Sequence, residues 1–242
     1  MGKRERALLY PLGSRFRERA VVMDAGDIHR ATWRIAHEIL ERNRGTEGLV
    51  LVGLQTGGVW FANELARVIG EASGSGPTAS KRTGSRGTGS RGTGAQSTGD
   101  VAHIPVGVLD VAYYRDDIGL RPVVPSAVTN VPVSLDGALV VLCDDVLFTG
   151  RTVRAALNAL VDMGRPAAVQ LAVVVDRGHR ELPIRPDYVG KNLPTRHDEM
   201  VDVSADGVVI GDIVTRDMLA GEPVTGEPVT GEPVTGDEGL LP

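Results

Sequence analysis

The sequence predicts an α/β fold with a mostly parallel central sheet and helices on both faces. Short apolar runs, bounded by glycine or acidic residues, alternate along the chain with segments whose apolar residues recur at helical spacing. The size is also suitable, because 242 residues with 42% hydrophobic and 24% charged side chains can form one well-buried domain.

The first expected element is an amphipathic helix over residues 24–43, with Asp24 or Asp27 as its N-cap. The later strands and helices have the same two signatures of short apolar runs and helical spacing. In chain order they are expected at residues 48–54 (strand), 59–71 (helix), 103–117 (one or two strands), 138–146 (strand), 152–163 (helix) and 169–177 (strand).

Two stretches of low complexity interrupt this pattern. Residues 72–99 repeat TGSRG and are basic, whereas the tail repeats GEPVT and is acidic. Neither can bury enough apolar surface to offset the entropy of ordering, so both are expected to be disordered. Because the two stretches have opposite charges, they could contact each other or attract RNA nonspecifically. The alternative is that both are solvated segments without a function of their own. The expected organisation is a flexible segment (1–20), one domain (21–216) with a disordered insertion (72–99), and a disordered tail (217–242).

Composition excludes several classes of protein. A single cysteine, Cys143, excludes a disulfide framework and a cysteine-based zinc site, and its place in an apolar strand favours packing over nucleophilic chemistry. No apolar run is long enough to cross a membrane, and the basic N-terminus lacks the apolar core of a signal peptide. The net charge of −5 argues against wholesale coating of nucleic acid. A cytoplasmic protein without membrane contacts is expected.

The most informative stretch is VVLCDDVLFTGRT, residues 140–152. An apolar strand ends in Asp144 and Asp145, and the loop TGRT then opens a helix. Backbone N–H groups at a helix N-terminus, with the hydroxyls of Thr149 and Thr152, form a cradle suited to a phosphate. Adjacent carboxylates can accept hydrogen bonds from ribose hydroxyls and hold Mg²⁺ nearby. The pattern predicts a site for a ligand that carries both a phosphate and a ribose.

This stretch resembles the phosphoribosyl pyrophosphate (PRPP) binding motif of type I phosphoribosyltransferases over its whole length. Other segments, RIAHEILERN (34–43), YYRDD (113–117) and DRGHRELPIRPDYVGKN (176–192), are similar to the PyrR family. That family comprises bacterial pyrimidine-operon regulators that also have uracil phosphoribosyltransferase activity. The resemblance covers nearly all of residues 20–203 except the insertion. It implies a type I phosphoribosyltransferase fold with a mobile flap and a small hood built from the C-terminal portion.

For catalysis, the resemblance implies transfer of ribose 5-phosphate from PRPP to uracil, giving UMP and pyrophosphate. The implied catalytic residues are Asp144, Asp145 and Arg115, and Mg²⁺ is the implied cofactor, held through PRPP near the two aspartates and not by protein side chains alone. Uracil is expected to contact Tyr188, by stacking, and Val189, through the backbone. Tyr188 as a core aromatic and Arg115 as a surface arginine are the alternatives. The implied PRPP-binding residues are Val140, Val141, Leu142, Cys143, Asp144, Asp145, Val146, Leu147, Phe148, Thr149, Gly150, Arg151 and Thr152.

The loop expected to hold pyrophosphate departs from the family pattern. It reads Gln55, Thr56, Gly57 and Gly58, and Gly57 stands where the family typically has arginine. The loop keeps its backbone donors but lacks a cation facing the leaving group, which affects the expected catalytic rate more than nucleotide binding. Compensation by Arg115, Mg²⁺ and the backbone is the alternative.

For RNA, the resemblance implies binding to leader hairpins of pyrimidine-biosynthesis messages, strengthened by UMP or UTP. Residues 177–197 are locally basic, which suits phosphate contacts and arginine stacking on loop bases. Trp33 stands where threonine is frequent, so that contact is unsupported, although an indole can stack on a base. The implied RNA-binding residues are His37, His179, Arg180, Arg185 and Lys191.

The expected function is therefore a uridine-nucleotide-dependent RNA regulator of pyrimidine genes with uracil phosphoribosyltransferase activity. The alternatives are a regulator whose catalysis is weak or lost, favoured by Gly57, and a salvage enzyme without an RNA role. Regulation by transcription attenuation or by translational repression is left open. A homodimer or homotetramer is expected from the family alone.

Overall fold

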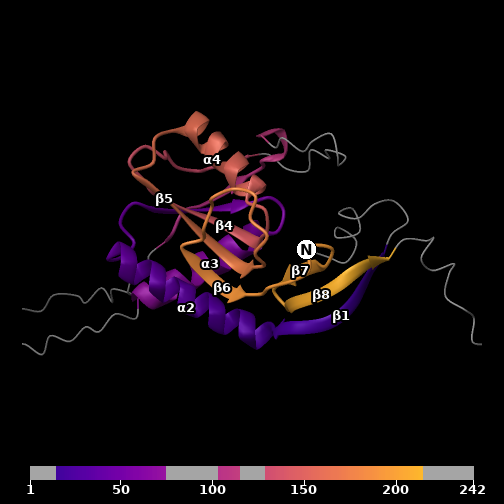
Figure 1. Ribbon diagram of the computed structural model, residues 1–242. Helices are drawn as coiled ribbons and strands as arrows, with labels where there is room; N and C mark the ends of the chain where they lie inside the picture. The colour runs from indigo at the N-terminus through magenta and orange to yellow at the C-terminus, as the bar shows by residue number, and fades with distance from the viewer. Residues whose placement is uncertain (1–14, 75–102, 115–128, 215–242) are drawn as a thin grey trace, which may run out of the picture.

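The computed structural model describes residues 15–74, 103–114 and 129–214 (Figure 1). These residues form a five-stranded sheet in the order β3-β2-β4-β5-β6 and a three-stranded sheet in the order β1-β8-β7. All pairings in the larger sheet are parallel, and those in the smaller sheet are antiparallel. The elements are β1 (Arg15–Asp24), α2 (Ala25–Asn43), β2 (Leu49–Leu54), α3 (Gly58–Gly74), β3 (Val106–Leu109), the 3₁₀ turn η2 (Ala112–Tyr114), β4 (Leu139–Leu147), α4 (Arg151–Met163), β5 (Ala168–Asp176), β6 (Tyr188–Asn192), β7 (Met200–Ser204) and β8 (Gly207–Val214).

Helices cover both faces of the five-stranded sheet, as the apolar strands predicted. Along the central strand β4, Val141 and Cys143 pack with α2 and α3, whereas Val140 and Leu142 pack with α4. All four side chains are fully buried. This alternation fixes β4 between two cores and leaves its carboxyl end as the place where polar residues can face a ligand.

The predicted helix and strand positions agree with the structure to within a few residues. Helix α2 begins after Asp24, and Asp24 and Asp27 cap its first turn reciprocally: each backbone N–H donates to the other residue's carboxylate, at 2.7 and 3.1 Å. Helix α3 extends to Gly74, so residues 72–74 belong to it and not to the insertion. Only one strand, β3, lies within the described part of the segment 103–117.

The hood corrects two expectations. Residues 15–20 are part of β1 and not of a flexible N-terminal segment, and the hood combines this strand with the C-terminal strands β7 and β8 (Figure 1). The reason is pairing, because β8 bonds along its length to β1 on one side and to β7 on the other. Buried Met23, Val203 and Val208 add the small sheet to the core under α2.

Several predicted features lie outside the described residues. They are Arg115, the expected flap, most of the insertion and the GEPVT tail. Among the helices that are described, none combines the length and the apolar character needed to cross a membrane.

Candidate functional site

The acid pair lies near the carboxyl end of β4. Asp144 is 7% exposed, and its carboxylate accepts the N–H of Asp145 at 3.1 Å. The Asp145 carboxylate accepts the N–H of Val146 at 2.8 Å. Burial raises the pKa of Asp145, and the negative charge of Asp202 on hood strand β7 adds to this effect. The hood therefore approaches the core at the acid pair.

The phosphate cradle follows directly on the acid pair. Gly150, at φ 92°, precedes α4 and has no side chain that could cap the N–H groups of the first helical turn. The Thr149 hydroxyl accepts from the Arg151 N–H at a long 3.4 Å. A helix N-terminus of this kind suits an anion. By contrast, five apolar residues of the motif have buried side chains: Val140, Val141, Leu142, Cys143 and Leu147. Contrary to the expectation for PRPP-binding residues, their side chains build the strand and do not face a ligand.

The predicted pyrophosphate loop packs against the same strand end. A Cβ atom at Gly58 would overlap the backbone carbonyl of Cys143, and a Cβ atom at Gly57 would overlap the Asp145 carboxylate. Glycine at both positions therefore allows the loop to approach β4 closely. The structure brings together the two loops and the acid pair, which the sequence predicted as one site.

Arg177, directly after β5, packs against the phosphate loop. It is 5% exposed, and its guanidinium lies over the Phe148 ring at 4.1 Å. The same guanidinium donates to the carbonyls of Glu199 and Arg196 at 2.7 and 3.0 Å and to the Thr195 hydroxyl at 3.0 Å. A charge buried to this degree requires such full pairing.

Arg180 has a different role from the expected RNA contact. Its guanidinium donates to the carbonyls of Phe148 at 2.7 Å and Ile184 at 3.0 Å and pairs with Asp176 at 2.6 Å. The group is half-buried and engaged with the protein, so it clamps the phosphate loop. Its neighbour Glu181 donates its N–H to the Thr149 carbonyl and pairs with Arg151 at 2.6 Å.

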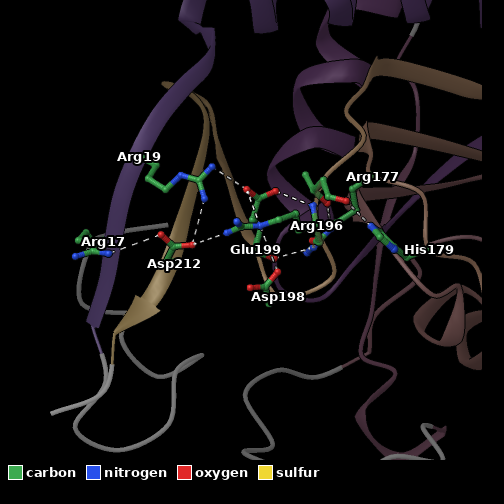
Figure 2. Close-up of polar contacts among 9 residues, drawn as sticks. Arg17, Arg19, Arg177, His179, Arg196, Asp198, Glu199 and Asp212 are labelled. Carbon is green, nitrogen blue, oxygen red and sulfur yellow. Dashed lines mark hydrogen bonds and ion pairs between the residues drawn. The ribbon is translucent and has the colours of Figure 1, made fainter. Parts of the chain in front are cut away.

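A charged network joins this region to the hood (Figure 2). Glu199 is buried and accepts the Arg196 N–H at 2.7 Å, and it pairs with Arg19 of β1 at 2.8 Å. Arg19 and Arg196 also reach Asp212 of β8, at 3.5 and 3.7 Å. The Arg196 N–H and the Arg19 charge lower the pKa of Glu199. Sequence reasoning did not single out Arg19 or Glu199, because no motif marks a contact between residues so far apart in the chain.

The structure contradicts the expected uracil contacts. Tyr188 is 3% exposed and packs in the core, with its hydroxyl donating to Gln170 at 2.8 Å. Stacking on a base requires an open ring face, and Tyr188 has none. The Val189 carbonyl already accepts from Arg34 at 2.8 Å.

The remaining predicted RNA residues lie on the surface. His37, Arg185 and Lys191 are exposed. His179 is also exposed, at φ 59°, and its Nε2–H donates to the Thr195 carbonyl at 2.6 Å. Its ring contacts Phe148 and His197, with centroids 5.5 and 5.6 Å apart.

Comparison with known proteins decides the family. Residues 24–206 match the family model described as Phosphoribosyl transferase domain. The chain is 47% identical over 190 residues to Bifunctional protein PyrR of Geobacter sp. (strain M21), covering 78% of this chain and 92% of the relative. This chain belongs to the PyrR family. A second PyrR, from Thermus aquaticus, is 48% identical over 195 residues, which cover 79% of this chain and 92% of the relative.

Solved structures agree with this assignment at the level of the fold. A hypoxanthine phosphoribosyltransferase of Trypanosoma cruzi superposes with a TM-score of 0.55 at 16% identity, covering 80% of this chain and 96% of that one. One from Staphylococcus aureus gives 0.54 at 18% identity, covering 81% and 93%. The PyrR-family chain thus has the type I phosphoribosyltransferase fold expected from its sequence.

Proposed function

We propose that this chain converts uracil and PRPP to UMP and pyrophosphate, and that it binds the leader RNA of pyrimidine genes in response to uridine nucleotides in the cytoplasm. The observation that carries the proposal is the Asp144–Asp145 pair near the end of β4, followed at once by the N-terminus of α4 with glycine at its N-cap. A phosphoribosyl group needs both features, since it carries an anion and vicinal hydroxyls. The family to which the chain belongs supports the choice of a pyrimidine.

In the proposed reaction, the N–H groups of the first turn of α4 hold the 5-phosphate, with Thr149 and Thr152 beside them. The Asp144 and Asp145 carboxylates accept hydrogen bonds from the ribose hydroxyls and stabilise positive charge that develops on the ring as the bond to pyrophosphate breaks. The pair also suits Mg²⁺, since carboxylate oxygens are its preferred ligands. Bound there together with PRPP oxygens, Mg²⁺ supplies neutralisation of the departing pyrophosphate.

The described residues contain no group of three or more histidine, cysteine, aspartate and glutamate side chains placed to hold a metal by themselves. The proposal therefore has the two aspartates share the ion with ligand oxygens. Arg115 remains part of the proposal as a residue that reaches the pyrophosphate, and a dimer or tetramer remains the expected assembly.

The contacts around the phosphate loop support a coupled RNA function. Residues 177–181 touch the loop through Arg177 on Phe148, Arg180 on the Phe148 carbonyl and Glu181 on Arg151. His179 lies in the same short segment and is exposed. A nucleotide phosphate that orders the cradle can thereby order the basic segment. This gives a physical route for UMP to strengthen RNA binding.

The test is UMP formation from labelled uracil and PRPP with Mg²⁺, together with retardation of the organism's own pyrimidine leader RNA with and without UMP. Turnover and a UMP-dependent shift are expected, with a scrambled RNA as the control at a stated salt concentration. If the protein binds neither UMP nor PRPP in calorimetry, the proposal is disproved. A shift without UMP dependence would remove the coupling.

One observation favours a second candidate, a nucleotide-sensing regulator with little catalysis. The pyrophosphate loop has no charged side chain, and the Asp145 carboxylate lies over Gly57. Comparing the native chain with Gly57→Arg separates the two candidates. Robust native turnover eliminates the weak enzyme, whereas activity that appears only in Gly57→Arg supports it.

A further inference from the structure

Arg177 carries a buried charge that has no part in the proposed reaction. The residue is 5% exposed, and its guanidinium lies over the Phe148 ring at 4.1 Å. Burial lowers the pKa of this guanidinium, and the negative charge of Glu199 opposes the effect. Well-packed apolar residues can often replace a buried charged group without loss of stability. Packing alone therefore does not explain an arginine at this position.

The side-chain hydrogen bonds of Arg177 all end in one loop, within the part of the chain that the structure describes. This hood loop, residues 195–199, directly precedes β7. The Arg177 Nε–H donates to the Thr195 hydroxyl at 3.0 Å. Its Nη2 group donates to the carbonyls of Arg196 and Glu199 at 3.0 and 2.7 Å (Figure 2). A planar guanidinium can reach several acceptors at once, which the single ammonium group of a lysine cannot reproduce.

The hood holds the same loop from its other side. The buried Glu199 carboxylate accepts the Arg196 N–H at 2.7 Å and pairs with Arg19 of β1 at 2.8 Å. Three residues beyond the loop, the charge of Asp202 acts on the pKa of Asp145. The hood loop therefore connects the phosphate loop to the strands of the hood that approach the acid pair.

This connection matters because the proposed ligand has two parts. The cradle and the acid pair account for ribose 5-phosphate, but the base is left without a partner, since Tyr188 is buried in the core. Phe148 directly precedes Thr149 of the cradle, so a phosphate that orders the cradle also acts on the ring under Arg177. A base on the hood side of the ribose then meets a hood loop that is already in place. Alignment of the base with the anomeric carbon requires such preorganisation.

We propose that Arg177 is a positioning residue for the reaction, which fixes the hood loop on Phe148 so that a phosphate in the cradle also sets the hood for the base. Arg177 itself touches neither the base nor the reacting atoms. The inference rests on the proposed function and adds to it the residue that couples the cradle to the hood. Coupling between two binding sites typically changes affinity by about 5- to 150-fold.

Two ligands that differ in the base test this coupling. UMP and ribose 5-phosphate share the phosphate and the ribose, so the ratio of their dissociation constants in calorimetry measures what the base adds. The native chain should bind UMP more tightly. Arg177→Lys keeps a positive charge near Phe148 but cannot reach all three acceptors in the hood loop. We expect its affinity for ribose 5-phosphate to stay within about threefold of native, and its preference for UMP to fall by about tenfold.

A milder variant removes a single bond without disturbing the fold. Thr195→Val keeps the shape of the side chain but loses the hydroxyl that accepts from Arg177, so the preference for UMP should fall by about three- to fivefold. Thr46→Val, in the turn before β2, makes the same exchange at the opposite end of the strands and should change neither affinity. Melting temperatures near that of the native chain would show that both variants fold.

Steady-state kinetics provide a second readout. In Arg177→Lys, the KM for uracil should rise and kcat should fall, each by about three- to tenfold, while the KM for PRPP stays within about threefold of native. General damage to the fold would not separate the two substrates in this way.

Four outcomes would overturn the inference, and they differ in what they leave standing. Equal losses of affinity for both ligands in Arg177→Lys and Thr195→Val would show that Arg177 supports the cradle alone. Unchanged affinities in both variants would show that the hood loop is set without Arg177. Equal binding of the two ligands by the native chain would show that the hood gains nothing from the base. These three results keep the proposed cradle, whereas a native chain that binds neither ligand removes the proposed function as well.

Discussion

The two loops that meet at the acid pair are held in opposite ways. Charged side chains fix the phosphate loop: Arg180 bonds its carbonyls, Arg177 lies over Phe148, and Glu181 pairs with Arg151. The pyrophosphate loop, Gln55 to Gly58, has no charged side chain and is held by its close approach to β4 at Gly57 and Gly58. The phosphate loop depends on the side chains around it, whereas the pyrophosphate loop depends on the lack of a side chain at Gly57 and Gly58.

This difference has a chemical consequence. In the phosphate loop, the helix N-terminus supplies positive potential from the protein itself. In the pyrophosphate loop, Gly57 lies against the Asp145 carboxylate, which repels an anion when ionised. Any pyrophosphate bound there depends on backbone donors, on a cation that arrives with the ligand and, in the proposed function, on Arg115. Catalysis should therefore be more sensitive to Mg²⁺ than binding of UMP is.

The largest effect is expected at Asp144, which lies in β4 where the two loops meet. Asp144→Asn keeps the shape but removes the charge that stabilises a cationic ribose, so UMP formation should fall by about 100- to 1000-fold. The measurement is turnover at saturating uracil and PRPP. Asp206→Asn, in the exposed β7–β8 turn, is the control and should retain activity. A loss below tenfold would show that the carboxylate does not act on the reacting ring.

Two adjacent glycines give the next largest effect. Gly58→Ala drives a methyl group into the Cys143 carbonyl, which the strand cannot move, and should lower the free energy of unfolding by about 1–3 kcal/mol. In Gly57→Ala the methyl meets the Asp145 side chain, which must swing aside and lose its hydrogen bond from the Val146 N–H, so a side chain and not the strand moves and the loss should be smaller. Urea unfolding of the two variants measures the difference between their free energies of unfolding. Equal losses would contradict the idea that a clash with the backbone costs more than a clash with a side chain.

The sequence predicted the strands, helices and acid pair because these depend on local pattern. The apolar run that ends in Asp144 and the loop TGRT are contiguous, so one stretch carries both the strand and the cradle. Whether a residue in a strand faces the core or a ligand was harder to predict. Tyr188 lies in a stretch typical of the family, yet only its place in the fold, opposite Ala172 of β5, shows that it is buried in the core.

Contacts between distant segments could not be predicted at all. Arg19 lies in β1 and Glu199 directly before β7, and they meet only because both strands pair with β8 in the folded protein. Arg180 resembles any basic surface residue until its carbonyl partners are known. The same limit explains the hood, since nothing in residues 15–20 indicates that they pair with β8. Such residues have no motif because their partners are set by topology and not by spacing.

Asp145 should show a smaller effect, on stability. Burial raises its pKa in the folded state above its unfolded value, so the stability linked to this group is complete below the unfolded pKa and is lost as the pH rises through the folded one. Asp145→Asn removes this loss and should raise the melting temperature near neutral pH, while lowering turnover. Near pH 3 the two proteins should melt together. If Asp145→Asn is less stable than the native chain near neutral pH, burial does not raise the pKa of Asp145.

The smallest effect is expected where the phosphate loop meets the basic segment. The Arg151–Glu181 pair is more than a third exposed on each side, and such pairs contribute about 0.2–1 kcal/mol. Glu181→Gln should therefore leave the melting temperature almost unchanged. If the pair transmits nucleotide binding, the ratio of RNA dissociation constants without and with UMP should fall by about two- to fivefold. Glu71→Gln, which loosens a similar exposed pair with Arg67 on α3, should not alter that ratio. An unchanged ratio in Glu181→Gln would mean that the coupling runs through Arg177 and Arg180, whose contacts with the loop survive the substitution.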